Sequence, residues 1–480
     1  MNHVEYAKLD ALDLKAAVSS GEVTIDELQN IAMSGIERLN PILNFLTAFT
    51  HETSKTALAT INRQAAFSGI PFLTKEGVGL KGQTVAAGCR MAKDISCDSD
   101  SELVRRLKAA GLVILGNTNA PELCSSDTTE PLLHGPARNP WNLEHSTGGS
   151  SGGAAAAVAA GIVPMAQAAD GGGSIRTPAH CCGVFGLMPT RGRTPAAANQ
   201  WGGPIAFTRQ HVITRSVRDS AAMLDQLLDH DASSWTRVKP PLHSYLSGIG
   251  RKPKPLSIAF STASPSGKPV HPDCVAAVHK AVRLCQNRGH TVEERAPRYD
   301  WELFAHAFED QWAINMRFGI ETLKKKTGRT AGPDTLEKSS LLALEHARSL
   351  TQERISTSLH QVYHIARQAE QFFNEWDIFI SPTCLTPAPQ LGELNGNAES
   401  LTGDQWFEQY FAAYVPFLPI CNVSGQPAMS VPLHQTGDGL PVGVHCVARF
   451  GEEDTLIQLA AQLEEAAPWA HRYPPHSLFN

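Results

Sequence analysis

Residues 148–192 read GGSSGGAAAAVAAGIVPMAQAADGGGSIRTPAHCCGVFGLMPTRG, a composition found nowhere else in the chain. This stretch contains 11 glycines. It is not a flexible linker, because its middle, Ala154–Ala160, is apolar and favours helix. Glycines packed between apolar elements indicate a backbone that is brought close to another group. The stretch therefore belongs to a folded site.

The second glycine cluster, Gly171–Gly173, is followed by Ser174 and has the composition of an oxyanion hole. Successive residues without side chains can turn several backbone N–H groups toward one point, where they bind developing negative charge. A serine after them can hold its hydroxyl near the carbonyl carbon under attack. We expect glycine here because a β-carbon would occupy the space of the substrate. Ser174 is therefore the candidate nucleophile.

A serine hydroxyl is a weak nucleophile at neutral pH and needs a base, yet neither cluster contains a histidine. A neutral lysine can serve when burial lowers its pKa from the free value of about 10.4. Lys75 follows an apolar run, residues 70–74, that predicts a buried strand. A second serine would relay the proton. Two alternatives stay open: Lys75 is a solvated strand-end lysine, or Lys81, which lacks the strand context, is the base.

The rest of the chain alternates between helix and strand, as is typical of α/β proteins. Thr24 and Glu27 have capping-box spacing before a helical pattern. We predict further helices at 101–110, 274–286 and 453–466, and a largely helical region over 301–371. We predict strands at 70–74, 112–115, 256–260, 291–293 and 378–380, and two around 437–439. Residues 229–255 read as a surface excursion. There is neither an internal repeat nor a convincing domain boundary.

The two serine–glycine clusters and their surroundings resemble the amidase signature family of Ser-cisSer-Lys hydrolases. The central motifs are Gly148–Gly153 (GGSSGG) and Asp170–Ala179 (DGGGSIRTPA). Matching segments on both sides extend the resemblance over nearly the whole chain: 69–75 (GIPFLTK), 116–122 (GNTNAPE), 138–141 (RNPW), 182–193 (CGVFGLMPTRGR), 422–428 (NVSGQPA) and 440–444 (LPVGV). A central motif of this length is not expected by chance.

The resemblance implies a role for each matching residue. Ser174 would be the acylated nucleophile. Ser150 would form a cis peptide with Ser151 and bridge Ser174 and Lys75 by its hydroxyl. Lys75 would be the base, and later the acid that protonates the leaving amine. The family's acyl pocket is often lined at the position of Cys124. The oxyanion hole would consist of the backbone N–H groups of Gly171, Gly172, Gly173 and Ser174.

The fold that the resemblance implies is α/β: one α/β/α sandwich around a large mixed, twisted β-sheet. We expect a single amidase domain over residues 1–480, with its signature core at about 75–193. Three positions depart from the family pattern, Glu76, Ala169 and Met188, and none of them removes a catalytic atom. Asp170 and Arg176 are expected to form a buried ion pair that holds the glycine loop.

Composition and charge exclude several other classes. The net charge of -6 gives no electrostatic preference for nucleic acid or an anionic membrane. The first residues lack the pattern of a secretory signal, and the most apolar stretch is too interrupted to span a bilayer. The ten scattered cysteines favour reduced thiols and a cytoplasmic location. The histidines lack metal-ligand spacing. We expect no metal or cofactor, a small-molecule amide as the partner, and neither nucleic acid nor membrane; a homodimer is left open.

We therefore predict an amidase that hydrolyses a carboxylic amide C–N bond through an acyl-enzyme on Ser174. One alternative is the glutaminase subunit of a tRNA-dependent amidotransferase, although residues 194–198 do not resemble that branch. A stand-alone hydrolase, like the cyclic-amide and oligomeric-amide hydrolases of the family, fits better. A second alternative is a catalytically silent binding protein on the same scaffold.

The substrate is not revealed by the motifs. Pocket walls are expected from the loop after Pro195, from residues 308–318 and from residues 414–419. Four aromatic residues suggest an apolar acyl site, although core packing explains them equally well: Trp312, Phe318, Phe411 and Tyr414.

Overall fold

The computed structural model describes residues 1–49, 61–195, 207–228, 238–251 and 254–480. The predicted wall in the loop after Pro195 and much of the predicted surface excursion lie outside these residues.

The α-helices are α1 (His3–Lys8), α2 (Ala11–Ser20), α3 (Ile25–Leu43), α5 (Glu102–Ala109), α6 (Gly152–Ala159), α7 (Arg176–Cys182), α8 (Val217–Leu227), α9 (Tyr245–Gly248), α10 (Pro272–Asn287), α11 (Trp301–Thr327), α12 (Lys338–Ser349), α13 (Gln352–Gln371), α14 (Gln405–Phe407), α15 (Pro419–Ser424) and α16 (Glu453–Ala466). Short 3-10 helices are η1 (Arg90–Ala92), η2 (Glu122–Cys124) and η3 (Phe372–Asn374), and η4 (Glu408–Ala412) is a π-helix.

One large sheet forms the centre of the molecule. Its 11 strands follow the order β1-β3-β2-β6-β8-β7-β12-β13-β11-β9-β10. The neighbours of β2 (β3 and β6) and of β9 (β10 and β11) are parallel to it, whereas the pairs from β6 to β11 and the pair of β1 with β3 are antiparallel. The predicted mixed sheet is therefore confirmed. The strands are β1 (Leu46–Phe49), β2 (Ile70–Lys75), β3 (Leu112–Thr118), β6 (Met165–Asp170), β7 (Phe185–Met188), β8 (Arg209–Thr214), β9 (Ser257–Phe260), β10 (Thr291–Glu294), β11 (Ile378–Pro382), β12 (Ala428–Gln435) and β13 (Pro441–Ala448), with β4 (Arg138–Asn139) and β5 (Asn142–Ser146) in a separate small sheet.

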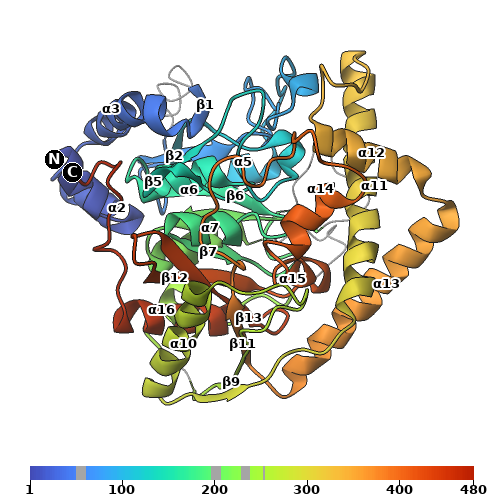
Figure 1. The fold of residues 1–480 in the computed structure, drawn as a ribbon. Coiled ribbons are helices and arrows are strands. Elements are labelled where there is room, and N and C mark those ends of the chain that lie inside the picture. The colour runs from blue at the N-terminus through green and yellow to red at the C-terminus, as the bar shows by residue number, and fades with distance from the viewer. Residues whose placement is uncertain (50–60, 196–206, 229–237, 252–253) are drawn as a thin grey trace.

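Helices cover both faces of the large sheet, which gives the three layers predicted (Figure 1). Strand β7 shows how the faces divide, because successive side chains point to opposite sides. Phe185 and Leu187 belong to an apolar cluster with α8, α10 and α16. A β-carbon at Gly186 would lie 2.7 Å from that of Ala179, so this residue faces α7 on the opposite side.

The topology explains why the predicted site residues meet. Strands β2 and β6 are parallel neighbours, so their carboxyl ends lie at one edge of the sheet. Lys75 is the last residue of β2, and Asp170, the last of β6, leads into the Gly171–Ser174 loop. In open α/β sheets ligands bind outside the carboxyl ends of strands. The Ser150 cluster precedes α6, which packs against both strands.

Most predicted elements match the structure to within a few residues. Thr24 and Glu27 form a complete capping box at α3, and α16 has the predicted bounds. The helical region predicted over 301–371 consists of α11, α12 and α13, which Figure 1 shows at the side of the molecule opposite α2 and α3.

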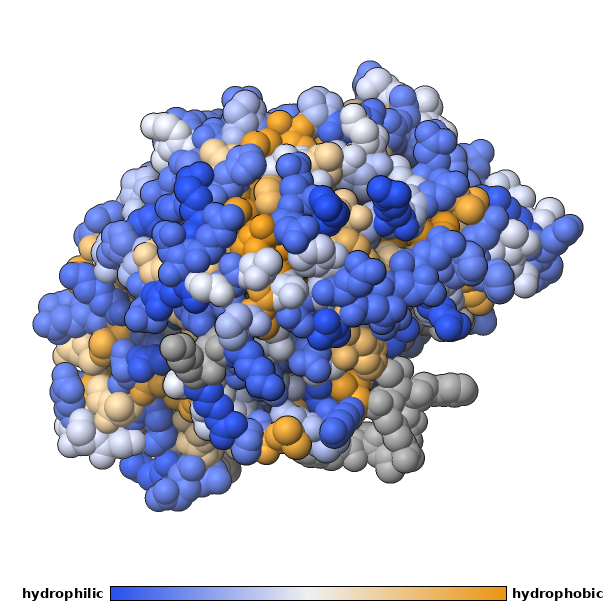
Figure 2. Space-filling model, turned by 90° about the horizontal axis from the view of Figure 1, so that it is seen from below, coloured by the Kyte–Doolittle hydropathy of each residue, from blue (hydrophilic) through white to orange (hydrophobic). Residues whose placement is uncertain are grey.

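The face of the molecule shown in Figure 2 is mainly hydrophilic. On this face hydrophobic residues form small separate areas among polar ones.

All ten cysteines are free thiols, and only Cys124 among them is half-buried rather than buried. Within the described ranges, no helix is both long and apolar enough to cross a membrane.

Candidate active site

Lys75 lies at the centre of the candidate site. Its side chain is fully buried, and its Nζ donates hydrogen bonds to Ser150 Oγ at 2.6 Å and to Ser151 Oγ at 3.1 Å. Its backbone N–H donates to Gln167 Oε1 at 2.8 Å, which ties the end of β2 to β6. The lysine is therefore not the solvated strand-end residue of the first alternative.

Burial lowers the pKa of the Lys75 amine, because a charge on a buried nitrogen loses its hydration. The thiol of Cys124 beside the amine and the carboxylate of Asp170 act in the opposite direction on this pKa. The net shift favours the uncharged amine, which is the form that can accept a proton.

The two serines before α6 are held differently. Ser151 Oγ donates to Ala169 O at 3.2 Å and accepts from Ala169 N–H at 3.3 Å, so this hydroxyl anchors the cluster to β6. Its backbone N–H donates to Ser174 O at 3.3 Å. No role was predicted for the Ser151 hydroxyl, and its position beside Ser150 was the only signal available in the sequence. The amine of Lys75 is therefore hydrogen-bonded to two neighbouring hydroxyl groups, those of Ser150 and Ser151.

The predicted cis peptide lies one bond earlier than expected. The structure places it between Gly149 and Ser150, not between Ser150 and Ser151. Ser150 is thus the cis residue, as predicted, but the cis peptide bond is the one before this residue and not the one after it. A β-carbon at Gly149 would lie 2.6 Å from the carbonyl oxygens of both Ser126 and Thr128, so the loop that contains these residues packs directly on the serine cluster.

Ser174 follows the glycine loop between β6 and α7, and the residue is 6% exposed. The structure adds a second reason for the glycines to the predicted one. A β-carbon at Gly172 would lie 2.7 Å from the Phe411 ring, and one at Gly173 would lie 2.7 Å from Leu418. The protein itself, not only the substrate, fills this space. Gly173 also has φ of +149°, a conformation that other residues rarely adopt.

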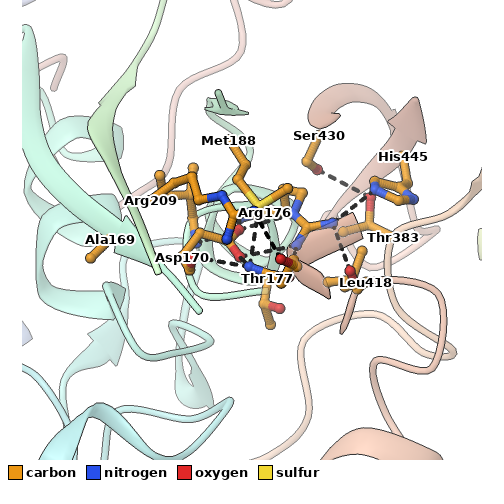
Figure 3. A network of polar contacts seen from close by, with 12 residues as sticks. Ala169, Asp170, Arg176, Thr177, Met188, Arg209, Thr383, Leu418, Ser430 and His445 are labelled. Carbon is orange, nitrogen blue, oxygen red and sulfur yellow. Dashed lines mark hydrogen bonds and ion pairs between the residues drawn. The ribbon is translucent and has the colours of Figure 1, made fainter. Parts of the chain in front are cut away.

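A buried polar network fixes the base of this loop (Figure 3). Asp170 and Arg176 form the predicted ion pair with contacts of 2.9 and 3.0 Å, and both side chains are fully buried. Asp170 Oδ2 also accepts from Ile175 N–H at 3.1 Å. Burial alone would raise the pKa of Asp170, but Arg176 and the hydrogen bonds lower it to about 2. The carboxylate is therefore charged at neutral pH.

Two further residues complete the network. Asn422 of α15 donates to Asp170 Oδ1 at 2.9 Å and accepts from Arg176 Nη2 at 2.7 Å. Arg176 Nη1 donates to His445 Nε2 at 3.0 Å, so the imidazole proton is on Nδ1, which donates to Ser381 Oγ at 3.1 Å. The loop is thus held from α15 and from β13.

The four aromatic residues named from the sequence separate into two groups. The rings of Trp312 and Phe411 lie against the glycine loop and contact each other at 5.3 Å between centroids. Phe318, by contrast, is 51% exposed on α11. Tyr414 is buried, and its hydroxyl lies 3.2 Å from Cys181 Sγ. Among the four, Trp312 and Phe411 are the ones whose rings lie against the glycine loop.

The histidines that were expected to be structural form local contacts. His134 Nε2 lies 3.1 Å from both carboxylate oxygens of Glu76, and His145 Nδ1 contacts Ala388 O at 2.8 Å. His180 lies between the backbone of Gly443 and that of Thr386. In the part of the chain that the structure describes, no group of three or more His, Cys, Asp or Glu side chains has a metal-binding arrangement.

Known proteins share this arrangement of elements. The model of the family described as Amidase matches residues 27–457. The chain belongs to the amidase family. The amidase is 34% identical to the 6-aminohexanoate-cyclic-dimer hydrolase of Paenarthrobacter ureafaciens, over 97% of this chain and 96% of that protein. It is thus an enzyme, an amide hydrolase that acts on C–N bonds.

Solved structures agree with this assignment of the amidase. The structure of 6-aminohexanoate cyclic dimer hydrolase complexed with substrate superposes with a TM-score of 0.89 at 32% identity, covering 99% of this chain and 100% of the other. A bacterial aryl acylamidase of the amidase signature family superposes with a TM-score of 0.86 at 25% identity, covering 97% of each chain.

Proposed function

We propose that this amidase forms an acyl-enzyme on Ser174, with Ser150 relaying protons to and from Lys75. The observation that carries the proposal is the 2.6 Å contact between Lys75 Nζ and Ser150 Oγ in a fully buried setting. An uncharged amine beside a hydroxyl is a general base, and the hydroxyl can pass the proton of a neighbouring serine to it.

In the first step Ser174 Oγ attacks the carbonyl carbon of the amide. Its proton moves to Ser150 Oγ while the proton of Ser150 moves to Lys75 Nζ. The carbonyl oxygen becomes an oxyanion, which the N–H groups of Gly171–Ser174 stabilise. Removing one such donor typically costs about 2.7–4 kcal/mol of barrier.

In the second step the C–N bond breaks. The Lys75 ammonium returns its proton through Ser150 to the departing amine nitrogen, and the acyl ester on Ser174 remains. A water molecule then attacks this ester with the same base, and the carboxylic acid leaves as Ser174 regains its proton. These steps use only side chains and backbone groups of the chain together with water.

The substrate class that we propose is a small amide with an apolar or aromatic acyl group. Trp312 and Phe411 support it, because their rings flank the loop where the acyl carbon would be held. The half-buried Cys124 beside Lys75 would contact the same group. The names of the relatives, a 6-aminohexanoate-cyclic-dimer hydrolase and an aryl acylamidase, are consistent with this class. We also propose a cytoplasmic location, which the free thiols support.

A fluorophosphonate probe followed by mass spectrometry of the intact protein tests the nucleophile. We expect one adduct on the wild type and none on Ser174→Ala, whose fold is monitored by circular dichroism. An unlabelled wild type would favour the catalytically silent alternative, and equal labelling of both proteins would exclude Ser174.

Turnover of the purified chain tests the substrate class. We expect hydrolysis of aliphatic and aryl amides without a partner protein. Activity on glutamine alone, increased by a partner subunit, would instead support the amidotransferase alternative.

A further inference from the structure

The glycine loop that we propose as the oxyanion hole has no side chains of its own to hold its shape. Successive glycines have more conformational freedom than other residues, so a fixed set of N–H groups needs support from outside the loop. The ion pair of Asp170 and Arg176 holds the base of the loop. The support for its middle, Gly171 and Gly172, comes from elsewhere in the chain.

Two aromatic rings lie against this part of the loop. A β-carbon at Gly172 would lie 2.7 Å from Cε1 and 3.3 Å from Cζ of Phe411. A β-carbon at Gly171 would lie 3.4 Å from Cη2 of Trp312. The edge of the Phe411 ring therefore packs directly on the middle glycine and makes the closer of the two contacts.

The ring of Phe411 is itself enclosed by three other rings. It stacks on Phe407 with centroids 4.5 Å apart, and it meets Phe308 and Trp312 at 5.4 and 5.3 Å in edge-on arrangements. These are favourable geometries for aromatic pairs. Phe411 is 3% exposed, and a close-packed interior allows such a ring little movement. The surrounding rings, not the loop, therefore fix the position of Phe411.

The backbone that carries Phe411 has an unusual form. The residues Glu408–Ala412 are a π-helix, in which the N–H of Ala413 donates to the carbonyl oxygen of Glu408, five residues earlier, at 2.9 Å. Turns of this kind are rare and occur frequently at functional sites. The π-helix is thus a second feature, independent of the ring contacts, at the residue that packs on Gly172.

We propose that Phe411 is a positioning residue for the oxyanion hole, whose ring keeps the N–H groups of Gly171 and Gly172 directed at the carbonyl oxygen of the substrate. This inference rests on the proposed function, because it takes Gly171–Ser174 as the hole. Donors that are already in place need no reorganisation during the reaction. Without the ring the loop would relax into the empty space, so the loss should appear in kcat.

Steady-state kinetics of Phe411→Ala on anilides with acetyl, butyryl and hexanoyl groups test the proposal. We expect kcat to fall by about 10- to 100-fold for each anilide while KM stays within about threefold, because the hole serves every acyl group alike. A loss confined to the longer acyl groups, or a loss in KM alone, would overturn the proposal, since Phe411 would then be only a wall of the acyl pocket. Unchanged kcat in the folded variant would also overturn it.

Inhibition by trifluoroacetone gives a readout of the hole itself. Ser174 Oγ adds to the carbonyl carbon, its proton passes through Ser150 to Lys75, and the former carbonyl oxygen becomes an oxyanion in the hole. The inhibition constant of Phe411→Ala should rise by about the same factor as kcat falls, because the adduct resembles the transition state. An unchanged inhibition constant beside a lowered kcat would contradict the proposed role.

Phe304→Ala is the matched control. Phe304 is fully buried in the same aromatic cluster and stacks on Phe308 at 5.7 Å, but it is not among the side chains nearest to Gly171 or Gly172. Both alanine variants should lower Tm, because each leaves a cavity in the core. Phe304→Ala should keep kcat and the trifluoroacetone inhibition constant within about threefold of wild type. Equal losses of kcat in the two variants would overturn the proposal, since general loosening of the cluster would then explain them.

Two further variants complete the test. If Phe411→Ala does not fold, Phe411→Leu fills more of the space and should show a smaller loss of kcat that is still equal for the different anilides. Failure of the proposed function would instead appear in Ser174→Ala, as retained turnover of the acetyl anilide. If Ser174→Ala is inactive while Phe411→Ala behaves like Phe304→Ala, the role of Phe411 alone is wrong.

Discussion

Ser150 and Ser151 differ at the scale of single hydroxyl groups. Both accept a hydrogen bond from Lys75 Nζ, at 2.6 and 3.1 Å. The Ser151 hydroxyl is also bonded to the backbone of Ala169 in both directions, whereas Ser150 is the residue proposed to relay the proton. Two neighbouring hydroxyls on one amine thus have separable roles.

Alanine substitution should separate these roles. We expect Ser150→Ala to lower kcat by about 10⁴-fold or more, as is typical for loss of one member of a catalytic unit. The loss of kcat in Ser151→Ala should be at least about a hundredfold smaller than that in Ser150→Ala. Ser151→Ala should mainly reduce the stability of the fold, because it removes an anchor to β6. Steady-state kinetics and thermal unfolding of both variants provide the comparison. Equal losses of kcat would contradict the assignment of the relay.

Gly172 illustrates a requirement set by packing. Gly172→Ala would place a methyl group 2.7 Å from the Phe411 ring. We expect the loop to shift and kcat to fall by about 10²–10³-fold, the typical cost of one lost oxyanion donor. Phe411→Ala in the same chain should restore part of this activity by providing space. Gly332→Ala, where nothing lies within 4 Å, is the matched control. A fully active Gly172→Ala would show that the loop tolerates the methyl group.

At the scale of elements, the Asp170–Arg176 pair joins the end of β6 to the start of α7. The folded-state pKa of Asp170, about 2, lies below its ordinary value of 3.8. A depressed carboxylate pKa stabilises the fold above the unfolded-state pKa, and this contribution is lost as the pH falls through the folded-state pKa. The pair therefore stabilises the loop at neutral pH and weakens between about pH 4 and pH 2.

Asp170→Asn should destabilise the protein at pH 7 by about 3–5 kcal/mol, because Arg176 is left buried without a charged partner. The difference from wild type should shrink on acidification toward pH 2, where the native Asp170 is also protonated. Denaturant unfolding at several pH values measures both effects. Asp94→Asn, which removes an exposed contact to Arg329, should leave stability unchanged. A constant difference at all pH values would contradict the pKa of Asp170.

The elements were largely predictable from local sequence, whereas their contacts were not. Periodicity and capping residues located α3 and α16, and an apolar run located β2, since these signals lie within one segment. The close approach of Phe411 and Leu418 to the glycine loop joins residues far apart in the chain. No local pattern encodes that approach, so the sequence could supply neither this further reason for the glycines nor the 51% exposure of Phe318.

The site itself was predicted in part. The motifs identified Lys75, Ser150 and Ser174 as candidates, and the topology brings the ends of β2 and β6 to one edge of the sheet. The contact of the Ser151 hydroxyl with Lys75 was missed because a second serine in a cluster has no distinctive spacing. Its significance depends on burial and on the 3.1 Å distance to Lys75 Nζ, which only the folded chain determines.

At the scale of the whole molecule, the ten free thiols provide a test of the packing. Nine are buried and Cys124 is half-buried beside Lys75. A thiol reagent should therefore modify one cysteine rapidly in the native protein and the others only on unfolding, as counted by mass spectrometry. We expect this first modification to abolish activity, and Cys124→Ser to resist it. Rapid modification of several thiols in the native state would contradict the packing of the core.

The most direct test of the central claim is kcat/KM for a simple aryl amide in Lys75→Met, which keeps the length and apolar stem of the side chain but removes the amine. We predict a loss of about 10⁴-fold or more with the fold retained, because Ser150 then has no base. Activity within about tenfold of wild type in a folded Lys75→Met would contradict the claim that the buried amine of Lys75 drives acylation of Ser174.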